Sequence, residues 1–130
     1  MANILIVDDE EMDRFLGSRI VEDAGHTAFF AGDGEVALQM YKDNDIALVI
    51  TDLRMPKVDG LSLIRDLLEH DPEVAIIAVS GDADQLEKAE SYGVHAGLIK
   101  PVEPEKLIGK VQEVLENLSA GGGDMWGSGW

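Results

Sequence analysis

The sequence contains no cysteine, and it has only 10 Lys and Arg residues against 26 Asp and Glu residues. The lack of cysteine excludes disulfides and thiolate metal sites, which fits a reducing compartment. The formal net charge is −16 at pH 7. A surface this acidic repels nucleic acid phosphates and anionic membranes, so we expect no direct nucleic acid binding. Cations and other proteins are the partners that this charge favours.

Long apolar stretches are also missing. No run approaches the roughly eighteen apolar residues that cross a bilayer, so we expect no membrane insertion. No basic start precedes an apolar stretch, so no secretory signal is recognisable, and we expect a cytoplasmic protein. Apolar residues make up 45% of the 130 residues and charged residues 28%, which favours one ordinary globular domain.

The chain does contain short, strongly apolar runs that each end at a polar residue. These runs are Ile4–Val7 before Asp8-Asp9, residues 47–51 before Asp52, residues 74–79 before Ser80, and Leu98-Ile99 before Lys100. Runs so short and so rich in β-branched residues predict strands that are buried on both faces of a parallel sheet.

Segments with helical periodicity separate these runs. They cover residues 12–24, 34–41, 61–68, about 84–91 and 104–118, and a fifth strand-like run covers residues 27–31. Strict alternation of strand and helix with short connections predicts an α/β fold, a five-stranded parallel sheet with helices on both faces. We expect one domain over residues 1–118.

Residues 119–130 read SAGGGDMWGSGW, which is rich in glycine and has no periodicity. We predict a flexible tail. It contains both tryptophans of the chain, Trp126 and Trp130. An appended segment of foreign origin, a docking motif that uses the indoles as anchors, and a tail that folds back on the domain all remain open.

The polar residues after the apolar runs should meet, because the carboxyl ends of parallel strands open onto one crevice. Mg²⁺ prefers oxygen ligands, and one or two carboxylates with a phosphate suffice. Asp8 and Asp9 could instead cap a helix, but the run of four acids from Asp8 to Glu11 repels itself without a cation. Asp52 follows a buried strand, where a carboxylate is unfavourable unless it is paired or liganded.

As a nucleophile, Asp52 could form an acyl phosphate. Lys100 would then offer positive charge to the phosphoryl oxygens, and Ser80 a hydroxyl donor. Taken alone, Lys100 reads as a surface lysine and Ser80 as a cap or turn residue. Together, at the ends of separate strands, they predict a magnesium-dependent phosphoryl site.

Four motifs carry a resemblance over residues 3–118. They are Ile6-Val7-Asp8-Asp9, Thr51–Gly60 (TDLRMPKVDG), Val79-Ser80-Gly81 and Lys100-Pro101. In this order and spacing the chain resembles a receiver domain of the two-component response regulators. The resemblance implies a flavodoxin-like doubly wound fold with strand order 2-1-3-4-5.

The resemblance also implies roles. Asp52 would accept a phosphoryl group from a phosphohistidine of a sensor histidine kinase or a histidine phosphotransfer protein. Asp9 and Asp52 would ligate Mg²⁺ directly, with the backbone carbonyl of Arg54 as a third ligand, while Asp8 would act largely through water. Lys100 would pair with the phosphoryl group.

Ser80 would move to hydrogen-bond the phosphoryl group and so signal to a downstream protein target. Such a domain is not an enzyme beyond its own phosphorylation and dephosphorylation. It would be a monomer or a phosphorylation-dependent dimer, either as a stand-alone regulator or as part of a larger one.

Two features concern the switch and its lifetime. Receivers usually carry an aromatic residue or histidine three residues before the lysine, but this chain has Gly97 there, so the usual side-chain rotation is lost. Any signal would then pass through backbone and loop shifts or through the first helix. Arg54 and Asp82 could form an ion pair over the phosphoryl group and slow its hydrolysis, or both could be solvated and independent.

Two other classes fit less well. A magnesium-dependent phosphohydrolase would need an Asp-x-Asp pattern on the first strand, whereas the presumed nucleophile Asp52 lies on the third. A flavin phosphate binder would need a Ser/Thr/Gly loop after the first strand, where this chain has four acids.

Overall fold

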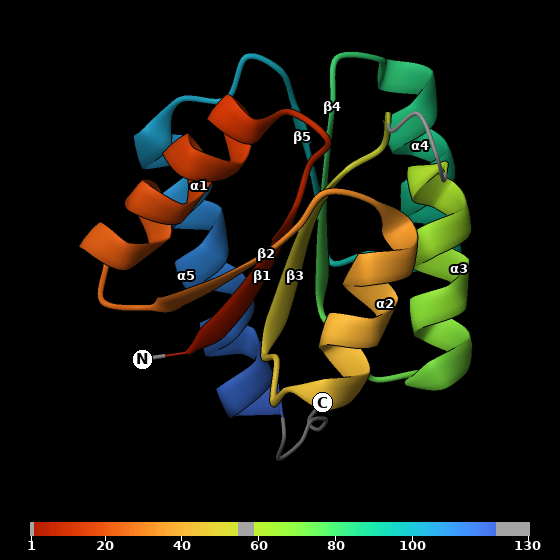
Figure 1. Cartoon of the computed structure of the whole chain (residues 1–130), viewed down its shortest axis with the longest axis horizontal. Helices are drawn as coiled ribbons and strands as arrows, with labels where there is room; N and C mark the ends of the chain where they lie inside the picture. The colour runs from red at the N-terminus through yellow and green to blue at the C-terminus, as the bar shows by residue number, and fades with distance from the viewer. Residues whose placement is uncertain (1, 55–58, 122–130) are drawn as a thin grey trace.

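The computed structural model describes residues 2–54 and 59–121, with side chains to residue 118. Strands and helices alternate along the chain (Figure 1). Their bounds are β1 Asn3–Val7, α1 Glu11–Asp23, β2 Thr27–Ala31, α2 Gly34–Asp43, β3 Leu48–Asp52, α3 Gly60–His70, β4 Ile76–Ser80, α4 Ala83–Tyr92, β5 Ala96–Ile99 and α5 Pro104–Gly121.

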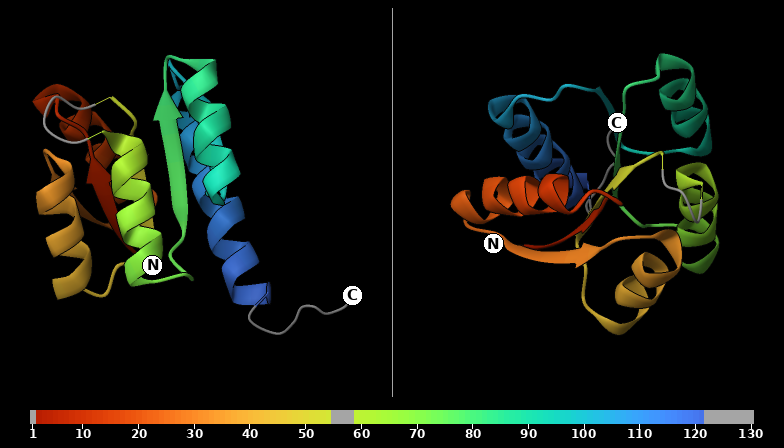
Figure 2. Two further views of the ribbon diagram at one scale, coloured as in Figure 1. Left: turned by 90° about the vertical axis from the view of Figure 1, so that its right-hand side faces the viewer. Right: turned by 45° about the horizontal axis from the view of Figure 1, so that its top comes forward.

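The five strands form one sheet in the order β2-β1-β3-β4-β5, and every neighbouring pair is parallel. Helices α1 and α5 cover one face, and α2, α3 and α4 cover the other (Figures 1 and 2). The predicted α/β fold with its doubly wound parallel sheet is therefore confirmed.

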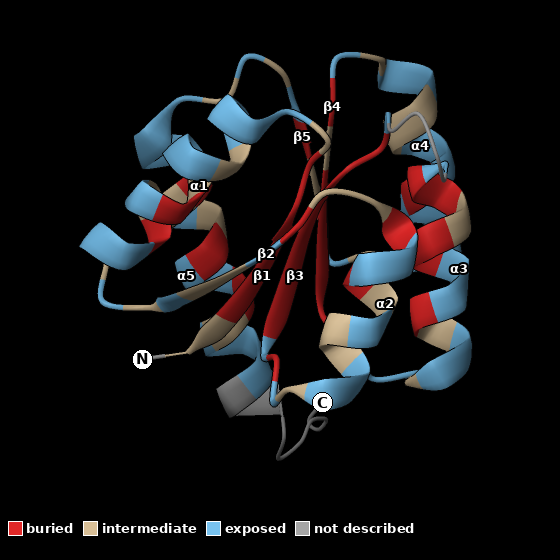
Figure 3. Cartoon of the chain, in the orientation of Figure 1, coloured by how far each residue is buried: buried red, intermediate tan, exposed pale blue. Residues whose placement is uncertain are grey.

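Side chains of the central strands alternate between the two faces of the sheet. In β1, Ile4 and Ile6 pack with α1 and α5, whereas Leu5 and Val7 join the core formed with α2, α3 and α4. Because both faces are covered, the central strands β1, β3 and β4 form the buried centre of the molecule (Figure 3). This explains why the sequence shows continuous apolar runs there.

Aspartates begin three of the helices. The side chains of Asp33, Asp59 and Asp82 each accept a hydrogen bond from a backbone N–H in the first turn that follows. These bonds satisfy donors that a helix leaves unpaired at its start. At the other end of α4, Gly93 has φ of 106°, a left-handed conformation that favours glycine.

Two expectations need adjustment. Met12, Phe15 and Leu16 belong to the apolar stripe that predicts α1, yet they are 65%, 54% and 51% exposed. Helix α5 continues to Gly121, three residues past the predicted end at 118, and residues 122–130 of the predicted tail lie outside the described residues. Within the described part of the chain, no helix is long and apolar enough to cross a membrane.

Candidate functional site

The carboxyl edge of the sheet gathers the polar residues that follow the strands. Asp8 comes directly after β1, Asp52 and Ser80 are the last residues of β3 and β4, and Lys100 follows β5. Asp8, Asp52 and Ser80 are buried, although almost every other buried residue in the described strands is apolar. The structure thus brings the predicted strand-end residues to one edge.

Lys100 lies at the centre of this group. Its Nζ is 3.0 Å from Asp52 Oδ2, 3.9 Å from Asp8 Oδ2 and 3.8 Å from Asp13 Oδ2. The backbone N–H of Lys100 donates to the carbonyl of Ser80, which ties the end of β5 to the end of β4. The Lys100–Pro101 peptide bond is cis.

Asp8, Asp9 and Asp52 form a carboxylate set in which one oxygen from each residue lies within 4.8 Å of the others. Burial, followed by the nearby charge of Asp52, raises the pKa of Asp8 to about 6, against the opposing effects of the Glu10 N–H and the Lys100 ammonium. Burial therefore disfavours the ionised form of Asp8 when no cation is bound. Hard oxygen donors this close together fit a divalent cation such as Mg²⁺.

Both carboxylate oxygens of Asp52 have hydrogen-bond partners. Oδ1 accepts a bond from the backbone N–H of Arg54 at 3.1 Å, and Oδ2 accepts one from Lys100. At Gly60 the chain lies again beside the end of β3, because the Gly60 N–H donates to the carbonyl of Leu53. The proposed ligation by the carbonyl of Arg54 stays a prediction.

The Arg54–Asp82 ion pair is not present in this structure. Arg54 is exposed, and the ion pairs of the described residues do not join it to Asp82. Asp82 instead accepts a hydrogen bond from Asp84 N and caps α4. The capping hydrogen bond joins residues that are close in sequence and stabilises the start of α4. An exposed ion pair with Arg54 would contribute little to stability.

Ser80 follows the residue that pairs with Asp52, and the described hydrogen bonds do not join the two side chains. Asp52 pairs with Val79 across β3 and β4, so Ser80 is one residue further toward the carboxyl edge. Its hydroxyl oxygen accepts a hydrogen bond from Asp82 N at 3.0 Å. The hydrogen bonds of the described residues give the hydroxyl hydrogen no acceptor, so it can still serve as a donor.

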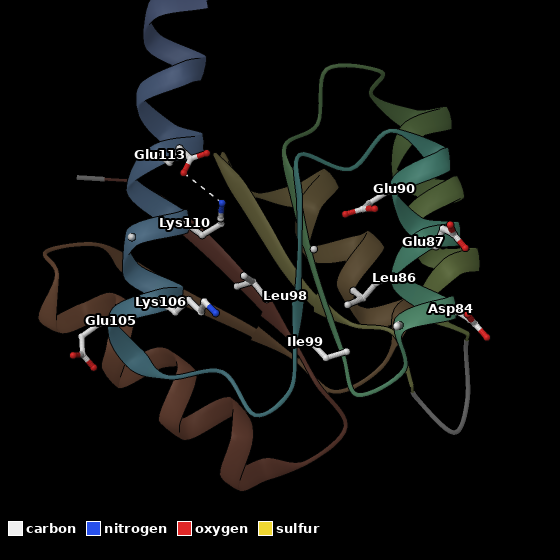
Figure 4. A pocket seen from close by; sticks show the side chains of 13 residues that line it. Asp84, Leu86, Glu87, Glu90, Leu98, Ile99, Glu105, Lys106, Lys110 and Glu113 are labelled. Carbon is white, nitrogen blue, oxygen red and sulfur yellow. Dashed lines mark hydrogen bonds and ion pairs between the residues drawn. The ribbon is translucent and has the colours of Figure 1, made fainter.

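Gly97 lines a groove of about 1120 Å³ between α4, β5 and α5 (Figure 4). A Cβ at this position would come within 3.3 Å of Glu90 Oε2 and of Leu86 Cδ2. These two α4 side chains thus lean over the strand where a larger residue would stand. The structure offers no side chain at position 97 that could rotate toward Ser80.

Two residues that contact the site were not predicted from the sequence. Asp13, in the first turn of α1, is an ion-pair partner of Lys100, and Arg14 Nη1 donates to the carbonyl of Asp8 at 2.7 Å. Asp9 lies outside α1, so no helical spacing links Asp13 to the acidic pair, and the sequence held no clear signal for these contacts.

Comparison with known proteins gives a consistent result. The family model described as response regulator receiver domain matches residues 4–112. The chemotaxis protein CheY of Halobacterium salinarum is 32% identical over 114 residues, which cover 86% of this chain and 95% of that protein. The sensor kinase CckA of Brucella abortus is 32% identical over 122 residues, 88% of this chain but only 13% of the kinase.

A solved structure shares the fold. The response regulator TrrA of Thermotoga maritima, crystallised in complex with Mg²⁺-BeF, superposes with a TM-score of 0.82 at 26% identity, covering 88% of this chain and 99% of TrrA.

Proposed function

Because this chain belongs to the response regulator receiver family, we propose that Asp52 is its phosphoacceptor and that the phosphoryl group comes from a phosphohistidine of a partner protein. The observation that carries the proposal is the contact of Lys100 Nζ with Asp52 Oδ2 at 3.0 Å beside two further carboxylates. A buried aspartate with a fixed ammonium at its side is suited to accept a phosphoryl group.

In the reaction, a carboxylate oxygen of Asp52 attacks the phosphorus atom. A P–O bond forms, the P–N bond to the imidazole breaks, and the imidazole keeps the electron pair and takes up a proton. The ammonium of Lys100 moves toward the phosphoryl oxygens and stabilises the negative charge that develops on them. The hydroxyl of Ser80 donates to one of these oxygens, while Asp82 N–H continues to donate to the hydroxyl.

The donor set of Asp8, Asp9 and Asp52 would hold Mg²⁺, with the carbonyl of Arg54 as a further proposed ligand. When bound, Mg²⁺ supplies positive charge that offsets the carboxylates and the phosphoryl oxygens. Phosphorylation adds about −1.5 to −2 charges, which Lys100 alone does not balance. Phosphorylation should therefore require the cation.

We further propose that the chain has no turnover of a separate substrate beyond its own phosphorylation and dephosphorylation. The partner that donates would be a sensor histidine kinase or a histidine phosphotransfer protein, and the output would be a protein target. The match to a segment of a sensor kinase and to a stand-alone chemotaxis regulator supports such partners without choosing between them.

The test is incubation with acetyl phosphate and Mg²⁺, followed by intact mass measurement. We expect one labile phosphoryl adduct in the wild type and none in Asp52→Asn. Asp66→Asn, an exposed change on α3, is the matched control and should retain the adduct. An adduct that persists in Asp52→Asn, or continuous release of phosphate at high turnover, would contradict the proposal.

A further inference from the structure

Lys100 is shared between the phosphoacceptor and a residue outside the predicted site. Its Nζ lies 3.0 Å from Asp52 Oδ2 and 3.8 Å from Asp13 Oδ2. Asp13 belongs to α1, whereas Asp52 is the last residue of β3. One cation thus bridges the end of a central strand and the first turn of a helix.

Asp13 also has an ordinary structural explanation. Acidic side chains in the first turn of a helix interact favourably with its dipole, and Glu11 occupies the same turn. Either acid could serve that purpose. Only Asp13 of the two contacts Lys100 among the described ion pairs, so the dipole does not account for this contact.

We propose that Asp13 is a positioning residue that competes with Asp52 for the Lys100 ammonium and thereby weakens the attraction of the site for a phosphoryl group. This inference rests on the proposed function. In the unphosphorylated protein, the Lys100 ammonium interacts with Asp13 as well as with Asp52. When a phosphoryl group forms on Asp52, its greater negative charge draws Lys100 away from Asp13.

The exchange of partners has a measurable consequence. Neutralising Asp13 removes one of the three carboxylates that attract Lys100 and leaves Asp8 and Asp52, so an anionic phosphoryl analogue should bind more tightly. Asp13 is 46% exposed, which limits the effect to about twofold to fivefold, the range expected for an exposed ion pair.

The experiment measures beryllofluoride affinity by NMR titration at saturating Mg²⁺, so that a change in cation affinity does not interfere. We expect Asp13→Asn to bind the analogue about twofold to fivefold more tightly than the wild type. The control is Glu11→Gln, which removes the same charge from the same turn and should bind like the wild type. Asp13→Glu should restore wild-type affinity.

A second readout follows Lys100 itself. The ¹³Cε resonance of Lys100 should shift in free Asp13→Asn but not in free Glu11→Gln, because only the first loses a contact with the ammonium. Equal beryllofluoride affinities for the two variants, or an unshifted Lys100 resonance in Asp13→Asn, would overturn the positioning role. A wild-type protein that forms no adduct on Asp52 would instead overturn the proposed function on which this role rests.

Discussion

Replacing Gly60 by alanine should damage both the fold and the phosphorylation site. A Cβ at Gly60 would lie 2.5 Å from Leu53 Cα, 2.7 Å from the Asp52 carbonyl oxygen and 2.9 Å from the Leu53 carbonyl oxygen. All three neighbours are backbone atoms, so no rotamer change can relieve the overlap. The start of α3 and the end of β3 must move apart.

Two effects of this substitution oppose each other. Alanine is favoured over glycine within a helix by up to about 1 kcal/mol, and Gly60 is only the first residue of α3. Overpacking in a well-packed site destabilises by about 1–3 kcal/mol, and contacts with backbone belong at the upper end of that range. We expect a net loss of about 2 kcal/mol, or a melting temperature about 8 °C lower for a domain of this size.

The displacement should also reach the phosphoacceptor. Asp52 supplies one of the crowded carbonyls, and the Gly60 N–H donates to the carbonyl of Leu53 at 3.1 Å. Moving this loop changes the position of the Asp52 carboxylate relative to Lys100. Adduct formation from acetyl phosphate, measured below the melting transition, should therefore be slower in Gly60→Ala than in the wild type.

Two other glycines provide controls. In Gly97→Ala the new Cβ meets only side-chain atoms at 3.3 Å, which can yield, so stability should stay within about 1 kcal/mol of the wild type. In Gly109→Ala nothing lies within 4 Å, and helix α5 should gain about 0.5–1 kcal/mol. Urea unfolding should rank the free energies of unfolding as Gly60→Ala lowest, Gly97→Ala intermediate and Gly109→Ala highest. A Gly60→Ala protein as stable as Gly97→Ala would refute the steric reasoning.

Three further predictions follow from the contacts. Asp8→Asn should stabilise the metal-free protein at pH 7 by about 3 kcal/mol at most, because the folded-state pKa of Asp8 is raised from 3.8 to about 6. Folding disfavours the ionised form of Asp8, so this gain in stability is fully present above pH 6 and disappears as the pH falls toward 3.8. Urea unfolding in the presence of a chelator, at both ends of that pH range, checks this prediction. A gain that does not depend on pH would contradict it. Tyr41→Phe should cost about 1 kcal/mol by removing the 2.7 Å bond to Asp71, with adduct formation by acetyl phosphate unchanged; slower adduct formation would show a role beyond stability. Excess chelator should abolish the phosphoryl adduct that intact mass measurement detects. An adduct that persists would show that phosphorylation does not require the cation.

The fold and the core of the site were predictable because both depend on local sequence patterns. Short apolar runs mark strands buried on two faces, and polar residues at their ends mark the edge where ligands bind. Asp8, Asp52, Ser80 and Lys100 each follow such a run, so their convergence required only the correct strand order. That order came from a resemblance and not from the runs themselves.

The burial of α1 was predictable only in part. Val21 of the predicted apolar stripe is fully buried, but the helix also packs on the sheet through small residues, with Ser18 buried and a Cβ at Gly17 reaching Ile6 Cδ1 at 3.4 Å. Small residues permit close approach but carry little hydrophobic signal. The larger Met12 and Phe15, which produce the apolar pattern, lie on another side of the helix and face solvent.

The contacts of Lys100 and the glycine at position 97 together limit how a change at Asp52 can spread. At position 97, Leu86 and Glu90 already occupy the space beside the strand, and no side chain is available to rotate. Lys100, by contrast, contacts three carboxylates, Asp8, Asp13 and Asp52, and an exchange between Asp13 and Asp52 needs only a small movement of its flexible chain. The exchange proposed at Lys100 leaves the core packed, and together with backbone shifts it is the mode of switching that these contacts favour.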